Sequence, residues 1–245
     1  MGRKGYRGGN ETEIPEMTTD TKKAAKAFFS TREERWNTWT HAAGILLGAC
    51  AGAAWLPRCI ASGDPWAEAG IALYLAGMLL SYVSSTAYHA ARPGSARKAR
   101  LRKWDHSAIY WHIAGSYAPI TLVAMRPEGA WAWGLTAFVY ACAVAGTAVS
   151  IAGLKDHSHA ETACFVLMGM SILAAFGPLS RCVGGAAVGW IVAEGVAYVT
   201  GAAFYTLHGR PYMHTVFHFF VLAGSACHIM AVEQIVAQHT ATALL

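Results

Sequence analysis

Hydrophobic residues dominate the chain from about residue 38 onward, in blocks separated by short polar stretches or by stretches that contain Pro and Gly. A helix needs about 20 mostly apolar residues to cross a bilayer, and the blocks have about this length. They predict seven membrane-spanning helices, with approximate ranges 39–56, 66–89, 107–125, 130–153, 161–180, 184–206 and 214–236. The division between the fifth and sixth ranges is the weakest, because Gly184 and Gly185 interrupt the apolar run without adding a polar side chain.

The composition agrees with a membrane protein. Hydrophobic residues make up 55% of the chain and charged residues only 13%, against about 25% charged residues in a soluble domain. We therefore expect an all-α, multi-pass protein of the cell (inner) membrane. Its expected parts are a polar, flexible cytoplasmic tail (1–37), a seven-helix transmembrane domain (38–238) and a short C-terminal tail (239–245).

The basic residues predict the orientation of the bundle. Eight Lys and Arg precede the first predicted span, and six more lie in the second loop, at Arg92, Arg97, Lys98, Arg100, Arg102 and Lys103. Every other loop has one, and the C-terminal tail has none. Because cytoplasmic segments collect Lys and Arg, we expect the N-terminus inside and, after seven spans, the C-terminus outside. The net charge of +5 fits this orientation better than it fits nucleic-acid binding.

Four polar residues are predicted to lie at this cytoplasmic face. His89 ends the second span, Asp105 begins the third, and His214 and His218 begin the seventh. Residues four apart lie on one face of a helix, so His214 and His218 could bind one ion, with His89 as a third ligand. Three histidines with an open fourth position are typical of a catalytic zinc site.

Two further residues could support such a site. Asp105 is placed to hold or deprotonate a water at the open position. Ser85 lies one turn before His89 and could hydrogen bond within the site. The ordinary alternative is that these are unrelated histidines near helix ends, which are common in membrane proteins, and imidazole also suits Cu, Fe and Ni.

The remaining histidines are predicted to lie away from the ligands. His228 lies about 21 Å deeper than His214 along a helix, so it either lines an internal polar path or is a hydrogen-bonded core residue. His41 begins the first span and could support the site. His106 follows Asp105 but points to another side of the helix, while His112 shares the face of Asp105, two turns further on.

Four short motifs occur in order between about residues 31 and 236, and together they resemble the hemolysin III family. This is the bacterial branch of the group that contains the progestin and adipoQ receptors. The motifs are Glu33-Glu34 with Asn37 and His41; Ser85-Thr86-Ala87-Tyr88-His89; Asp105-His106-Ser107-Ala108-Ile109 with Gly115-Ser116-Tyr117-Ala118-Pro119; and His214-Thr215-Val216-Phe217-His218 with Gly224-Ser225-Ala226-Cys227-His228. The polar tail before Thr31 and the residue His112 depart from the family pattern.

The resemblance implies a seven-helix membrane fold with a zinc ion near the cytoplasmic face. It implies that His89, His214 and His218 are the zinc ligands and that Asp105 matches a carboxylate near the zinc-bound water. The wider group includes alkaline ceramidases, which cleave a lipid amide, and the adiponectin receptors have a similar site.

Three functions are consistent with this resemblance. The first is a zinc-dependent hydrolase of lipid amide or ester bonds, with membrane lipids as partners and no nucleic acid. The second is a non-enzymatic sensor or membrane-homeostasis protein in which zinc holds the helices together. The third, a channel or lytic factor, has the least support. A hydrolase needs a lipid-sized cavity that reaches the metal, whereas a structural zinc needs none.

Overall fold

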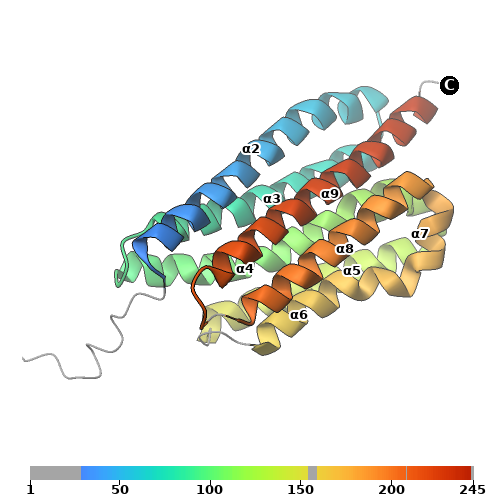
Figure 1. Cartoon of the computed structure of the whole chain (residues 1–245). Helices are drawn as coiled ribbons and strands as arrows, with labels where there is room; N and C mark the ends of the chain where they lie inside the picture. The colour runs from blue at the N-terminus through green and yellow to red at the C-terminus, as the bar shows by residue number, and fades with distance from the viewer. Residues whose placement is uncertain (1–28, 154–158, 208, 244–245) are drawn as a thin grey trace, which may run out of the picture.

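The helices of the bundle run side by side along one long axis (Figure 1). The computed structural model describes residues 29–153, 159–207 and 209–243. Its α-helices are α2 (Thr31–Ser62), α3 (Pro65–Ala90), α4 (Ala96–Ala118), α5 (Ala130–Gly153), α6 (His159–Met170), α7 (Phe176–Cys182), α8 (Gly185–Tyr205) and α9 (Met213–Ala243). Short π and 3-10 segments join some of them: η1 (Pro119–Ala124), η2 (Arg126–Glu128) and η3 (Ser171–Ala175). If α6, η3 and α7 are taken as one unit, the described residues form seven helices, and the predicted all-α fold is confirmed.

Six of these helices are long and apolar enough to cross a membrane, counted over the described residues. They are Thr31–Ser62, Pro65–Ala90, Ala130–Gly153, His159–Cys182, Gly185–Tyr205 and Met213–Thr242. The protein is therefore an integral membrane protein. The predicted third span is the exception, because its helix α4 begins at Ala96, includes the basic stretch at 97–103 and is less apolar than the others.

The first helix is longer than the apolar pattern predicts. Its start at Thr31 places the end of the expected polar tail in a helix, while residues 1–28 lie outside the described part of the chain. Ser30 and Glu33 cap this start, since the Ser30 hydroxyl accepts from the Glu33 N–H (3.2 Å) and the Glu33 carboxylate accepts from the Ser30 N–H (2.9 Å). The predicted first span ends at residue 56, before Pro57, whereas α2 continues through Pro57 to Ser62. Proline lacks an N–H, but membrane helices tolerate it where neighbouring groups satisfy the freed carbonyl.

A second proline changes the helix type. After Ala118 the chain continues as the π segment η1, which begins at Pro119 and closes with a 2.8 Å hydrogen bond from the Met125 N–H to the Ile120 carbonyl. Beyond it, Arg126 hydrogen bonds to Asp64 (2.9 Å) and holds the pKa of this carboxyl below its ordinary value. This ion pair joins two connections at the end of the bundle remote from Arg92.

Close packing of α3 against α4 sets the positions of the polar residues. Gly77 lies against the backbone of Trp111, and a methyl group at Gly115 would lie only 2.9 Å from the carbonyl oxygen of Leu73. Small residues permit this close approach of two helices in a membrane. The last turn of α3 is thereby placed beside the first half of α4.

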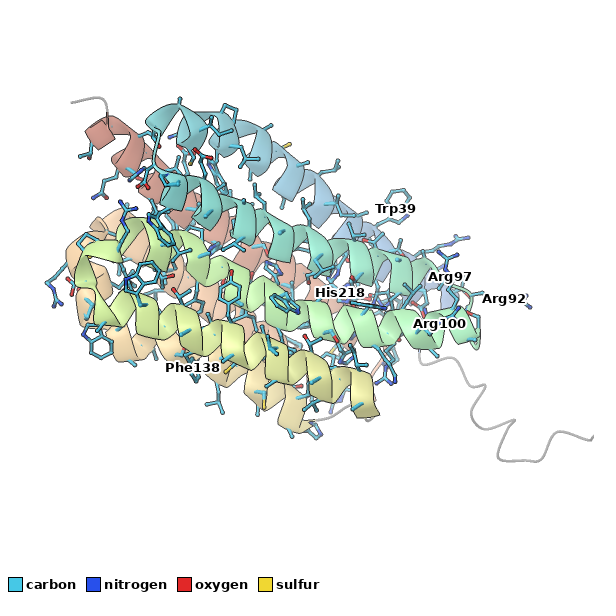
Figure 2. The ribbon with its side chains drawn as sticks, turned by 180° about the vertical axis from the view of Figure 1, so that it is seen from behind. Trp39, Arg92, Arg97, Arg100, Phe138 and His218 are labelled. Carbon is cyan, nitrogen blue, oxygen red and sulfur yellow. The ribbon has the colours of Figure 1, made fainter. Side chains whose placement is uncertain are left out.

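One end of the bundle carries the basic residues of the α3–α4 connection and the start of α4. Figure 2 labels Arg92, Arg97 and Arg100 at this end, with His218 in the same half of the molecule. We call it the basic end. It contains the last turn of α3 and the first turns of α2, α4 and α9.

Candidate metal site

Three histidines from two helices converge at the basic end. His89 lies in the last turn of α3, while His214 and His218 lie one turn apart at the start of α9. Their nearest ring nitrogens all lie within 4.8 Å of one another, and the Nε2 atoms of His214 and His218 are 3.0 Å apart. The structure thus brings together the three histidines that the sequence singles out, although His89 is more than 100 residues from the other two in the chain.

The donor atoms of this cluster suit a metal ion. Nitrogen ligands lie about 2.0–2.1 Å from zinc, so two nitrogens on one ion are separated by no more than about 4 Å, and the 3.0 Å pair meets this limit. The Nε2 atom of His89 is buried and has no hydrogen-bond partner among the described residues. A buried polar atom of this kind requires a partner, and a cation bound by the three imidazoles would provide one.

The outer ring nitrogens of two of these histidines lie against polar groups of α2. The Nδ1 atom of His89 lies 2.8 Å from a Glu34 carboxylate oxygen, and the Nδ1 atom of His218 lies 3.3 Å from the Thr40 hydroxyl. Lys98 contacts the other oxygen of Glu34 at 2.9 Å. Carboxylates that accept from the second nitrogen of a metal-bound histidine fix its orientation and raise its basicity. The residue patterns alone did not assign Glu34 this position.

A second contact also joins α2 to α9. The Thr215 hydroxyl donates to the side-chain oxygen of buried Asn37 at 2.7 Å. Asn37 lies between Glu34 and His41 on one face of α2, so this face supplies polar groups to the site at three successive turns. That spacing, in a helix that faces the bundle, was the available sequence signal for Glu34.

Asp105 faces the histidine cluster across a small pocket. The pocket lies between Asp105 and His214, with Tyr88, Arg102 and Tyr205 among its other walls, and has a volume of about 20 Å³. This is room for about one water molecule. Ser85 hydrogen bonds to Asp105, so it supports the carboxylate and not a histidine.

The other histidines occupy separate positions. His41 stacks on His218 with ring centroids 3.8 Å apart, and neither of its ring nitrogens has a hydrogen-bond partner in the described structure. His106 pairs with Glu161 at 2.9 Å, and it also lines the pocket that Asp105 and His214 line. His112 and His228 lie deeper in the bundle and do not belong to the cluster.

Comparison with known proteins places this arrangement in a family. The profile described as Haemolysin-III related matches residues 29–229. The chain belongs to the haemolysin-III-related family. Hemolysin-3 of Bacillus cereus is 32% identical, covering 84% of this chain and 93% of its own length. The Hemolysin-3 homolog of Bacillus subtilis (strain 168) is 31% identical, covering 83% and 94%.

The likeness of this haemolysin-III-related protein extends to animal proteins. The human Monocyte to macrophage differentiation factor is 27% identical, covering 82% of this chain and 83% of its own length. All the site residues described above lie within the range that the family profile matches. None of the relatives' names states a metal or a reaction, so the chemistry has to be argued from the site.

Proposed function

We propose that this haemolysin-III-related protein is a zinc-dependent hydrolase that cleaves an amide or ester bond of a membrane lipid. The observation that carries the proposal is the pocket of about 20 Å³ between Asp105 and His214. It can hold one water, and its lining includes the carboxylate of Asp105 and, from the proposed metal-binding cluster, His214. This arrangement supplies a base and a nucleophile at one point.

Each residue has a distinct part in this proposal. His89, His214 and His218 would hold the ion, and Glu34 orients the His89 ring through its Nδ1 atom. When bound, zinc would lower the pKa of a coordinated water to about 7 and polarise a carbonyl group. Asp105 would accept the proton of the water in the pocket as general base, while Ser85 holds its carboxylate in place.

A lipid is the proposed substrate because the site lies between membrane helices and beside an apolar groove. The groove has a volume of about 240 Å³ and lies between α2 and the start of α9, where Trp36, Val216 and Phe219 line it. Thr215 lines the same groove and lies between His214 and His218 in sequence. Membrane lipids can reach such a groove from the bilayer, and nothing in it is suited to nucleic acid.

The proposed orientation places the basic end in the cytoplasm. It rests on the preference of Lys and Arg for cytoplasmic segments and on an odd number of spans. A reporter protein fused after Leu245 should therefore read as extracytoplasmic, and one inserted in the connection at 91–95 should read as cytoplasmic. A cytoplasmic reading at the C-terminus would mean that one helix, most simply α4, does not cross the membrane.

A second candidate function is a sensor or membrane-homeostasis protein with a structural zinc. The small size of the pocket favours it, because about 20 Å³ cannot admit a lipid headgroup without movement of the helices. In this alternative the ion only joins α3 to α9 through His89, His214 and His218. The hydrolase needs an opening that the structural role does not.

The variant Asp105→Asn distinguishes the two functions. It keeps the shape of the side chain and the three ligands, so bound zinc should remain. Hydrolysis of ceramide-like and ester lipids in detergent should fall by roughly 10²–10⁴, the usual contribution of general base catalysis. Asp64→Asn, which removes a carboxylate at the far end of the bundle, is the matched control and should retain the wild-type rate.

The same assay includes His218→Ala, which should lose both metal and activity. If zinc is structural, Asp105→Asn should keep its fold and its cellular phenotype. Equal turnover by wild type, Asp105→Asn and His218→Ala would assign the activity to a contaminant and remove the support for the hydrolase.

A further inference from the structure

A second buried carboxylate–imidazole pair lies in the middle of the bundle, away from the metal site. Glu194 of α8 lies 2.7 Å from the Nδ1 atom of His228 on α9, and their side chains are 13% and 2% exposed. His228 is about 21 Å further along α9 than His214, which places the pair near the middle of a bilayer. Ionisable side chains are costly at this depth and mark functional sites by default, proton relays among them.

The pair has capacity for more hydrogen bonds than it makes. The Nε2 atom of His228 is buried without a partner among the described residues, and so is the hydroxyl of Tyr74, whose ring lies 4.7 Å from the His228 ring. A pair that served only to hold α8 against α9 would not need these open groups. They leave the imidazole able to donate or accept a further proton.

Other titratable groups lie near the pair on four helices, and among the described residues none of them is a lysine or arginine. They are Tyr74 on α3, His112 and Tyr117 on α4, Tyr198 on α8 itself, and Cys227 on α9. Among the described residues, His228 is the ion-pair partner of Glu194. With no permanent cation beside it, the charge of Glu194 depends on protons.

A row of hydroxyl groups leads from the pair toward the basic end. Tyr198 lies one turn after Glu194 on α8, and Ser225 lies one turn before His228 on α9. The Tyr198 hydroxyl is 3.0 Å from Ser225, and the Tyr82 hydroxyl of α3 donates to Ser225 at 2.7 Å. The Tyr82 ring then meets His41 edge-on at 5.2 Å between centroids.

We propose that Glu194 and His228 form a proton-binding site within the membrane, and that the hydroxyls of Tyr198, Ser225 and Tyr82 carry protons between this site and the basic end. The proton comes from water at the basic end. Uptake of one proton by the pair raises its net charge by one, and release reverses the change. No other bond forms or breaks. The proposal stands without zinc or hydrolysis.

Infrared difference spectroscopy of the full chain in lipid nanodiscs, titrated from high to low pH, tests the site. A protonated-carboxyl band should appear as the pH falls, disappear in Glu194→Gln and shift in Glu194→Asp. Glu233→Gln is the matched control, because Glu233 is a glutamate of the neighbouring helix α9 that pairs with Arg58 at 2.9 Å outside the row. This control should keep the band. If Glu194→Gln does not fold, Glu194→Asp and ¹³C-glutamate labelling of the wild type still assign the band.

A pH jump on the same samples tests the hydroxyl row. Tyr82→Phe and Tyr198→Phe should slow the growth of the band about tenfold or more and leave its final amplitude unchanged. Tyr140→Phe removes a buried hydroxyl of α5 that also lacks a partner in the described structure, and it should have no effect. No band from Glu194 at any pH would make the pair a structural brace and overturn the proposal. An unchanged rate in both tyrosine variants would overturn the hydroxyl row.

Discussion

His89 and His228 carry the same local arrangement in two different surroundings. Each Nδ1 atom pairs with a carboxylate of a neighbouring helix, Glu34 at 2.8 Å and Glu194 at 2.7 Å. Each Nε2 atom is buried and has no hydrogen-bond partner in the described residues. The difference lies in what surrounds the free nitrogen. For His89 it is two further imidazoles, and for His228 it is a tyrosine ring.

The surroundings therefore decide the chemistry of each pair. Three neutral imidazoles that converge within 4.8 Å offer lone pairs to one cation, as zinc sites do. The His228 pair has hydroxyl groups nearby instead, and these exchange protons but are poor ligands for zinc. The two carboxylates also differ in their neighbours, because Lys98 lies 2.9 Å from Glu34 and neutralises its charge. In our proposals, the same carboxylate–imidazole pair thus serves a metal at one depth and a proton at another.

The largest expected effect is the loss of metal from the double variant His214→Ala/His218→Ala. Purified wild type should hold about one zinc, and the double variant should hold none, because one histidine cannot hold the ion alone. Elemental analysis of the purified proteins measures this directly. His228→Asn is the control and should keep its zinc. If the double variant still held one zinc, the metal would not depend on His214 and His218, and the proposed difference between the cluster and the His228 pair would be lost.

A smaller effect is expected from the carboxylates themselves. Glu34→Gln should weaken zinc binding by about 10–100-fold, the usual cost of losing the group that orients a ligand histidine. Glu194→Gln should leave zinc affinity within about twofold, because its partner His228 is not in the cluster. Competition with a fluorescent chelator gives both constants. If Glu34→Gln and Glu194→Gln weakened zinc binding equally, the Glu34–His89 and Glu194–His228 pairs would act as one unit.

The smallest expected effect concerns Lys98. Lys98→Met removes the ion pair to Glu34 but leaves the carboxylate beside His89. Since Lys98 acts on His89 only through Glu34, zinc affinity should fall by less than in Glu34→Gln, by no more than about fivefold. Lys103→Met is the matched control, because Lys103 contacts the Ile151 carbonyl at 2.7 Å and no residue of the site. A loss as large as that of Glu34→Gln would show that Lys98 is needed to keep the carboxylate in place.

The sequence predicted the helices better than their ends and irregularities. Apolar block length is a direct consequence of bilayer thickness, so the helices were found. Pro57 was read as a break although α2 continues through it, and the π segment after Pro119 left no sign in the hydrophobic pattern. Both depend on how neighbouring helices satisfy backbone groups, and local sequence does not record this.

The sequence predicts which site residues lie at the same depth in the membrane. It does not predict contacts that depend on how one helix is rotated against another. His89, His214 and His218 could be placed together because each lies at a helix end on the same side of the membrane. The pairing of Glu34 with His89 joins residues 55 positions apart and depends on the rotation of α2 about its axis. The size of the pocket at Asp105 depends on side-chain packing, which no residue pattern specifies.

The central claim is that His89, His214 and His218 bind one zinc ion. The most direct test is a crystal structure of the purified full chain with diffraction data collected on both sides of the zinc absorption edge. We expect one anomalous peak among the three rings, with Zn–N distances near 2.0–2.1 Å. Zinc bound elsewhere in the bundle, or three histidines without metal in protein purified with zinc present, would show that these residues do not form the zinc site.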